Sequence, residues 1–173
     1  METWTDEKGV ERTRRHYRAP TAEDEARERK VLELLRERFD DWQARGCIPS
    51  RRIEPGYNTN QPIRERGWTH WHHLFTPRQL LVSGLLLLES GSKGHIRDQA
   101  SCLLGINRVS DWSSRLTRWD PTPGKEFVVQ TFGNQALNTL YDFGCRGLTY
   151  SKSNFNLRIE PQRCYPSIIL PLD

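Results

Sequence analysis

The strongest constraint on the fold is the stretch from Gly67 to Leu88, GWTHWHHLFTPRQLLVSGLLLL, which joins an aromatic cluster to a clear helix start. Thr76 is a good N-cap, Pro77 suits the first helical position, and Gln79 can complete a capping box. From Leu80 to Leu88 the residues are apolar nearly all round, which predicts a core helix buried on several sides. The apolar run of about ten residues is well short of the roughly 20 that a membrane span requires, so no membrane partner is expected.

Size and composition predict one folded domain with a basic surface. A chain of 173 residues suits a single domain, and 6 Trp, 6 Phe and 5 Tyr are too many large rings for a disordered chain. Of the 26 basic residues 21 are Arg, and the basic excess falls after residue 40. Because arginine suits phosphate and guanine contacts, this favours a nucleic-acid partner. The alternative is that the arginine content reflects a GC-rich genome.

Neither the cysteines nor the histidines form a recognisable metal site. The four cysteines are widely separated and make no Cys-x-x-Cys pair: Cys47, Cys102, Cys145 and Cys164. With no signal peptide, this pattern predicts a reduced, cytoplasmic protein. His70, His72 and His73 lack the fixed spacing of a zinc helix, so we expect them to hydrogen-bond or face water, with no metal bound. Nucleophile-elbow, phosphate-loop and dinucleotide glycine patterns are also absent from the sequence.

The N-terminal half is predicted to hold an arm, a helix and a connector. Residues 1–20 read as an extended or frayed arm, and residues 21–173 as a single α+β domain. Thr21 caps a helix that Gly46 ends. Its apolar face is marked by Val31, Leu35, Phe39 and Trp42. Residues 47–66 contain prolines and turn signals, which predicts an irregular connector.

The C-terminal half is predicted to begin with a second long helix at about residues 96–115. Its short connection to the central helix predicts an antiparallel helical hairpin. The expected inward face of the second helix is Ile96, Ala100, Leu103, Leu104, Asn107 and Trp112. Residues 126–132 are predicted to form a strand, 134–143 a short helix, and 155–159 and 167–170 further strands. The fold class is therefore α+β and mainly helical, with a central helical hairpin and a few short strands towards the C-terminus.

Several side chains have the chemistry of DNA contacts. The connector carries four arginines beside Tyr57 and the two tryptophans of the aromatic cluster, a combination that suits phosphate contacts and base stacking. Carboxamides at residues 134–138 can hydrogen-bond an adenine edge, with helix capping as the competing explanation. Arg118 can grip a DNA backbone or join a cation–π cluster inside the fold. The candidate DNA-binding residues are Arg64, Arg66, Trp68, Trp71, Arg78 and Arg118, with Asn134, Gln135 and Asn138 as second-rank base readers.

Four ordered blocks carry a resemblance to a known family over about residues 15–150. They are RHYRAPTAED with GCIPSRRIEPG, then GWTHWHHLFTPRQLL, then SSRLTRW, and lastly QTFGNQAL followed by Tyr141 and Asp142. In these blocks the chain resembles the zinc-ribbon-containing adenine-specific DNA methyltransferases. In that family the blocks lie between a glycine-rich loop that binds S-adenosylmethionine and an Asp/Asn-Pro-Pro-Tyr motif that grips the flipped adenine. Neither motif occurs here, nor does the zinc ribbon.

The resemblance implies a DNA-engaging, target-recognition-like segment without catalytic residues of its own. Methyl transfer to adenine requires an extruded base held against the cofactor, so the chain is not expected to methylate DNA alone. Its implied partners are DNA and a catalytic methyltransferase chain that binds S-adenosylmethionine. The alternative is a structural or assembly module, or a non-catalytic remnant, of the same enzyme. Buried tryptophans would favour this alternative, whereas a basic groove with exposed rings would favour DNA engagement.

Overall fold

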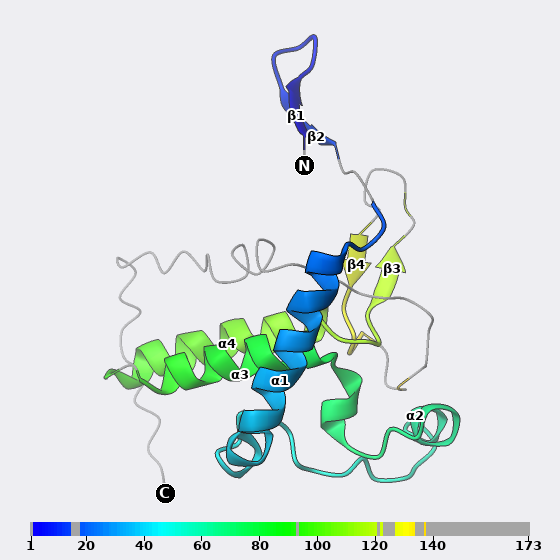
Figure 1. The fold of residues 1–173 in the computed structure, drawn as a ribbon, viewed down its shortest axis with the longest axis vertical. Helices are drawn as coiled ribbons and strands as arrows, with labels where there is room; N and C mark the ends of the chain where they lie inside the picture. Colours follow the sequence, from blue (N-terminus) through cyan, green and yellow to red (C-terminus); the bar gives the residue numbers. More distant parts are fainter. Residues whose placement is uncertain are drawn as a thin grey trace, which may run out of the picture.

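The structure is a computed structural model that describes residues 2–14, 18–92, 94–120, 122, 127–133 and 137. Within these residues the fold is mainly helical with short antiparallel strand pairs, which confirms the predicted α+β class and its central helical hairpin. Figure 1 shows α1 crossing the paired helices α3 and α4, with α2 to one side. The elements in chain order are β1 (Glu2–Thr5), β2 (Glu11–Arg14), α1 (Ala22–Ala44), α2 (Asn60–Arg66), the 3₁₀ helix η1 (Trp71–Leu74), α3 (Pro77–Gly91), α4 (Ile96–Trp112), β3 (Arg118–Asp120) and β4 (Phe127–Val129).

The N-terminal segment contains a β-hairpin, where the sequence predicted an extended or frayed arm. Strands β1 and β2 pair in antiparallel fashion. The Asp6 carboxylate accepts hydrogen bonds from the backbone N–H groups of Lys8 (3.0 Å) and Val10 (2.9 Å). Gly9 has a φ of 74°, which glycine adopts without steric cost. The prediction missed the hairpin because the Asp6 side chain closes its turn. In the sequence this aspartate is one of many charged residues, so the turn is not recognisable from the pattern.

Helix α1 begins and ends at the predicted residues. The Thr21 side chain accepts a hydrogen bond from the Asp24 N–H, and the Asp24 carboxylate accepts one from the Thr21 N–H at 2.9 Å. Beyond the last turn Gly46 has a φ of 73°, the left-handed conformation common just after a helix. Leu35 and Trp42 are buried on the face that the apolar spacing predicted.

Helix α3 has the predicted start but is less buried than predicted. The Thr76 hydroxyl accepts the Gln79 N–H at 3.3 Å, and the Gln79 side chain accepts the Thr76 N–H at 2.8 Å. The helix packs against both α1 and α4, and Leu80 and Leu81 are buried. The expectation of burial on several sides is wrong for the side that carries Leu85, whose side chain is 51% exposed.

The contact between α1 and α3 depends on a glycine. Trp42 is only 2% exposed, and a Cβ atom placed on Gly84 would lie 2.2 Å from Cζ3 of its indole ring. The ring therefore occupies the space in which any residue type other than glycine at position 84 would place its Cβ atom. Around this contact Cys47, Ile48 and Leu81 belong to the same buried cluster, so the main core forms where α1 and α3 meet.

The predicted inward face of α4 is wrong. Ile96 is 72% exposed and Leu104 is 64% exposed, whereas Ile106 and Val109 are buried. Helix α4 is apolar on two sides, and the side that holds Ile106 and Val109 is the buried one. Apolar spacing alone does not distinguish the two sides, because both recur at helical intervals. The side that holds Leu103 and Leu104 remains at the surface.

The connector is more regular than predicted, because α2 occupies its second half. Pro62, which reads as a helix breaker in the sequence, lies in the first turn of α2, where its missing N–H would have no helical partner. Gly67 has a φ of 65° and ends the helix by donating its N–H to the Ile63 carbonyl at 3.0 Å. The expectation of an irregular segment is therefore wrong from Asn60 onward.

Strands β3 and β4 form an antiparallel pair that is hydrogen-bonded to the end of α4. Strand β4 lies inside the predicted 126–132 strand, whereas no strand was predicted at the position of β3. Thr131 donates its N–H to the Asp111 carbonyl at 2.7 Å, and its hydroxyl lies 2.7 Å from that of the buried Ser114. Phe132 donates its N–H to the Asp111 carboxylate at 2.9 Å. These bonds fix the sheet to the helical part.

Some predictions concern segments outside the described residues. They are the short helix at 134–143, the strands at 155–159 and 167–170, and the extension of the domain to residue 173. Among the helices that the structure does describe, none combines the length and the apolar character needed to cross a membrane.

Replacing Gly84 by alanine is expected to destabilise the fold. The added methyl group overlaps the Trp42 ring, and overpacking of this kind costs about 1–3 kcal/mol of unfolding free energy. Gly91→Ala is the matched control, since nothing lies within 4 Å of its Cβ position in the same helix. Urea unfolding followed by circular dichroism compares the two variants. Equal unfolding midpoints for Gly84→Ala and the wild type would contradict the proposed packing.

Candidate nucleic-acid interface

The first half of the connector is held by backbone pairing to the segment before α3. Ile53 donates its N–H to the Thr69 carbonyl at 2.9 Å, and Trp71 donates its N–H to the Arg51 carbonyl at 3.1 Å. An isolated antiparallel bridge joins Arg52 to the same segment. The Ile53 side chain is 3% exposed and belongs to a second buried cluster with Leu74. These contacts fix the path of the connector on the core.

A hydrogen-bonded turn leads from this anchored part into α2. The Asn60 N–H donates to the Gly56 carbonyl at 2.9 Å, and the Gly56 N–H donates to the Asn60 side-chain oxygen at 3.1 Å. The Thr59 hydroxyl donates to the Glu54 carbonyl, and the Leu137 N–H donates to the Asn58 carbonyl at 2.8 Å. The turn is therefore bonded both to itself and to a distant part of the chain.

The connector and α2 carry an excess of exposed positive charge. Residues 51–66 contain four arginines and two glutamates, a net charge of two positive units. The Arg64 side chain is 79% exposed and lies 3.5 Å from Glu65, and the Arg51 side chain is 78% exposed and lies 2.9 Å from Glu54. Exposed ion pairs of this kind are weak, so they exchange readily for contacts with phosphate. Arg66, at the end of α2, is also exposed.

The structure places Trp68 and Trp71 against the core beneath the connector. Both rings are partly buried and pack on the second buried cluster. The Arg115 guanidinium lies 5.5 Å from the centre of the Trp68 ring, and burial lowers the pKa of this guanidinium. The tryptophans therefore help to hold the connector on the core. This arrangement is the one expected if these rings have a structural role.

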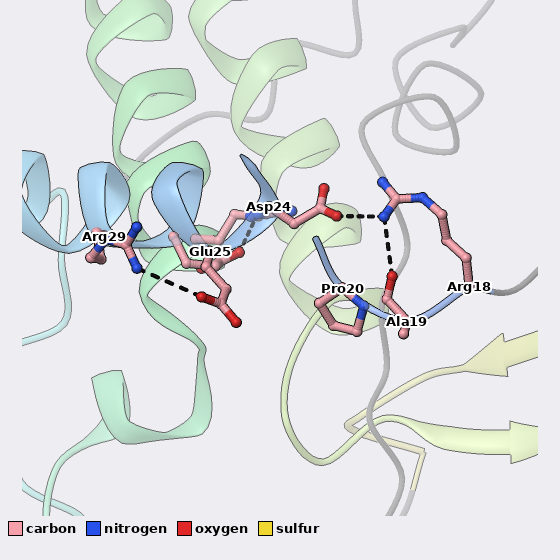
Figure 2. Close-up of a pocket in the computed structure, with 8 residues that line it drawn as sticks. Arg18, Ala19, Pro20, Asp24, Glu25 and Arg29 are labelled. Carbon is pink, nitrogen blue, oxygen red and sulfur yellow. Dashed lines mark hydrogen bonds and ion pairs between the residues drawn. The ribbon is translucent and has the colours of Figure 1, made fainter. Parts of the chain in front are cut away.

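Arg78 faces α1, where its side chain forms an ion pair with Glu28. A hollow of about 750 Å³ lies here, at the N-terminal end of α1. Figure 2 shows Arg18 reaching Asp24 across its edge, a pair that is 2.7 Å apart and holds the pKa of the carboxyl well below its usual range. Its lining residues are Arg18, Ala19, Pro20, Asp24, Glu25, Glu28, Arg29 and Arg78. With three bases and three acids, the hollow has no excess charge for a phosphate.

Arg118 and the carboxamides complete the candidate residues. Arg118 lies on β3, and a Cβ atom placed on Gly133 would lie 2.7 Å from one of its terminal nitrogens. Its buried Nε atom has no hydrogen-bond partner in the described part of the chain. The guanidinium is thus folded against the turn after β4. Asn134, Gln135 and Asn138 lie outside the described residues.

The three histidines form a compact cluster at η1. Neighbouring ring centres are 4.4 Å apart for His72 and His73, and 5.3 Å for His70 and His72. His72 donates its Nδ1–H to the Pro49 carbonyl at 2.9 Å, and His73 accepts the Thr69 N–H at Nδ1 at 3.1 Å. No metal-binding group of three or more side chains occurs among the described residues. The cluster instead ties η1 to the connector.

The environment lowers the proton affinity of two of these rings. Burial lowers the pKa of His72, the hydrogen bond to Pro49 opposes this shift, and the charge of His70 adds to it. Burial and the neighbouring imidazoles and Arg115 lower the pKa of His73. Both rings therefore bind protons less readily in the folded chain than in the unfolded chain. The contribution of these two histidines to the free energy of unfolding is fully present above the ordinary pKa of 6.5. It is lost as the pH falls below that value, because the unfolded chain then binds protons that the folded chain does not.

The free energy of unfolding is expected to be lower at pH 5.5 than at pH 7.5. Urea unfolding at the two pH values, followed by tryptophan fluorescence, measures the difference. A His72→Gln, His73→Gln double variant keeps hydrogen-bonding side chains but cannot be protonated, so its pH dependence is expected to be flatter. A wild-type chain that is equally stable or more stable at pH 5.5 would contradict the described histidine environment.

Comparison with known proteins finds no family model, no curated protein and no solved structure that matches this chain. The candidate interface therefore depends on its own geometry. One residue outside the list of candidates stands out there, since Tyr57 at the tip of the turn is 100% exposed. In the sequence Tyr57 stands between Gly56 and Asn58, two residues that favour turns, and this pattern could have indicated its exposure.

Proposed function

We propose that this chain engages DNA through the connector and α2, as a target-recognition-like segment of an adenine-specific methyltransferase assembly. The observation that carries the proposal is the set of exposed arginines on a hydrogen-bonded frame fixed to the core. Arginine presents a planar fork of donors that matches phosphate oxygens. A frame that is already ordered loses little conformational freedom on binding, which favours affinity.

The charge distribution supports this location for the DNA. Helix α1 carries eight acidic and five basic side chains, whereas the connector and α2 are basic. Phosphates are therefore repelled from α1 and attracted to the connector. Arg64 and Arg66 are the leading contacts, because they are exposed at the end of α2. Arg78, paired with Glu28 of α1, is a weaker candidate.

In this proposal the methyl-transfer chemistry belongs to a catalytic partner chain. That partner would bind S-adenosylmethionine and hold the extruded adenine. The present chain would contribute affinity and orientation through backbone contacts, which position a protein on DNA without reading its sequence. The resemblance to the methyltransferase family supports this assignment, and the protein is expected in the cytoplasm with its DNA substrate.

A structural or assembly module of the same enzyme is the second candidate function. Two observations favour it. Trp68 and Trp71 pack on the core, and the helical hairpin exposes Leu85 on α3 and Leu103 and Leu104 on α4. Exposed apolar side chains of this kind are available for docking to a partner. Under this alternative the folded chain does not bind DNA.

An Arg64→Ala, Arg66→Ala double variant is expected to bind duplex or single-stranded DNA more weakly than the wild type. The slope of log affinity against log salt should fall by about 2, one unit for each phosphate contact removed. Fluorescence anisotropy with labelled oligonucleotides at several salt concentrations measures both quantities. The matched control is Arg27→Ala, Arg29→Ala, which removes the same charge from α1.

Equal weakening by the two double variants would show that net charge alone governs binding, against the assigned interface. If the folded wild-type chain binds neither form of DNA at low salt, the proposal is wrong and the assembly-module alternative stands. Circular dichroism establishes that each variant is folded.

A further inference from the structure

Tyr57 is presented to solvent on a rigid support. Its side chain is 100% exposed, whereas the exposed rings of Trp4, Trp119 and Phe132 retain between 45% and 53% of their surface. The turn that carries it is closed by reciprocal hydrogen bonds between Gly56 and Asn60. A fully exposed aromatic ring on an ordered turn needs little rearrangement before it binds a flat partner.

The ring and the arginines of α2 lie in one short stretch of the chain. Tyr57 lies in the turn three residues before Asn60, the first residue of α2, and Arg64 and Arg66 lie in the last turn of the helix. A seven-residue helix is roughly 10 Å long. This length is about the rise of three stacked nucleotides at 3.4 Å each. A strand of a few nucleotides is therefore long enough to follow α2 from the turn that carries the ring to the arginines.

We propose that Tyr57 is a stacking platform for an unpaired base, and that the nucleic acid held by the connector and α2 is single-stranded DNA. This inference rests on the proposed function and narrows it to one class of ligand. Single-strand binding sites combine a basic track with aromatic side chains on which bases stack. In a duplex the faces of the bases are already covered by their neighbours, so the ring has nothing to stack on.

The surrounding charges also favour one strand over two. The basic segment at residues 51–66 has a net charge of only two positive units, and α1, which precedes it in the chain, carries an excess of acidic side chains. One backbone can follow the short basic segment. A second backbone adds negative charge for which these residues offer few further partners. In this proposal Tyr57 and α2 contribute to the affinity for single-stranded DNA in different ways. Tyr57 contributes base stacking, and the arginines of α2 contribute phosphate contacts.

The test uses the full chain and fluorescence anisotropy with a labelled single-stranded oligonucleotide and with the duplex of the same sequence. The wild type is expected to bind the single strand more tightly than the duplex. Tyr57→Leu is expected to weaken single-strand binding by about tenfold, a typical loss for one stacked base, without changing the salt slope. Tyr57→Phe keeps the ring and is expected to restore binding.

Trp4→Leu removes another exposed ring, on the N-terminal hairpin, and is expected to leave the affinity unchanged. Single-strand binding by Tyr57→Leu equal to that of the wild type would overturn the inference, and so would a duplex bound as tightly as the single strand. Either result leaves the proposed function in place if binding remains sensitive to the α2 arginines. A folded wild-type chain that binds neither oligonucleotide overturns both.

Discussion

The packing of the Trp42 ring on the backbone of Gly84 is the contact on which the rest of the structure depends. It sets how closely α1 approaches α3, and with it the position of the main core. Helix α3 in turn packs against α4. Phe75, just before α3, packs against both buried clusters. The core that α1 and α3 build is thus continuous with the one beneath the connector.

The candidate interface follows from this packing. Leu74 and Ile53 lie in the second cluster, and the backbone of the connector is paired to the segment that leads into α3. The turn at Tyr57 and the arginines of α2 are therefore displayed by the same core that holds the helices. Under the proposed function, the excess of acidic side chains on α1 and of basic side chains at residues 51–66 would direct a phosphate backbone to the connector and α2.

Sequence patterns predicted the features that depend on local chemistry. The caps at Thr21 and Thr76 arise from side chains that satisfy backbone groups three residues away, so a short stretch of sequence is sufficient to find them. The inward face of α4 was mispredicted because the helix has two apolar sides, and only packing against the rest of the fold selects between them. The packing of Trp68 and the exposure of Tyr57 likewise depend on contacts between segments far apart in the sequence.

The most direct test of this account is amide chemical-shift mapping of the ¹⁵N-labelled chain during titration with a short single-stranded DNA. The account predicts that the largest shifts fall at residues 56–66, in the turn and α2, with little change along the acidic face of α1. Shifts concentrated instead around the exposed Leu85, Leu103 and Leu104 of α3 and α4, or the absence of any shift at low salt, would contradict the central claim that the connector and α2 engage DNA.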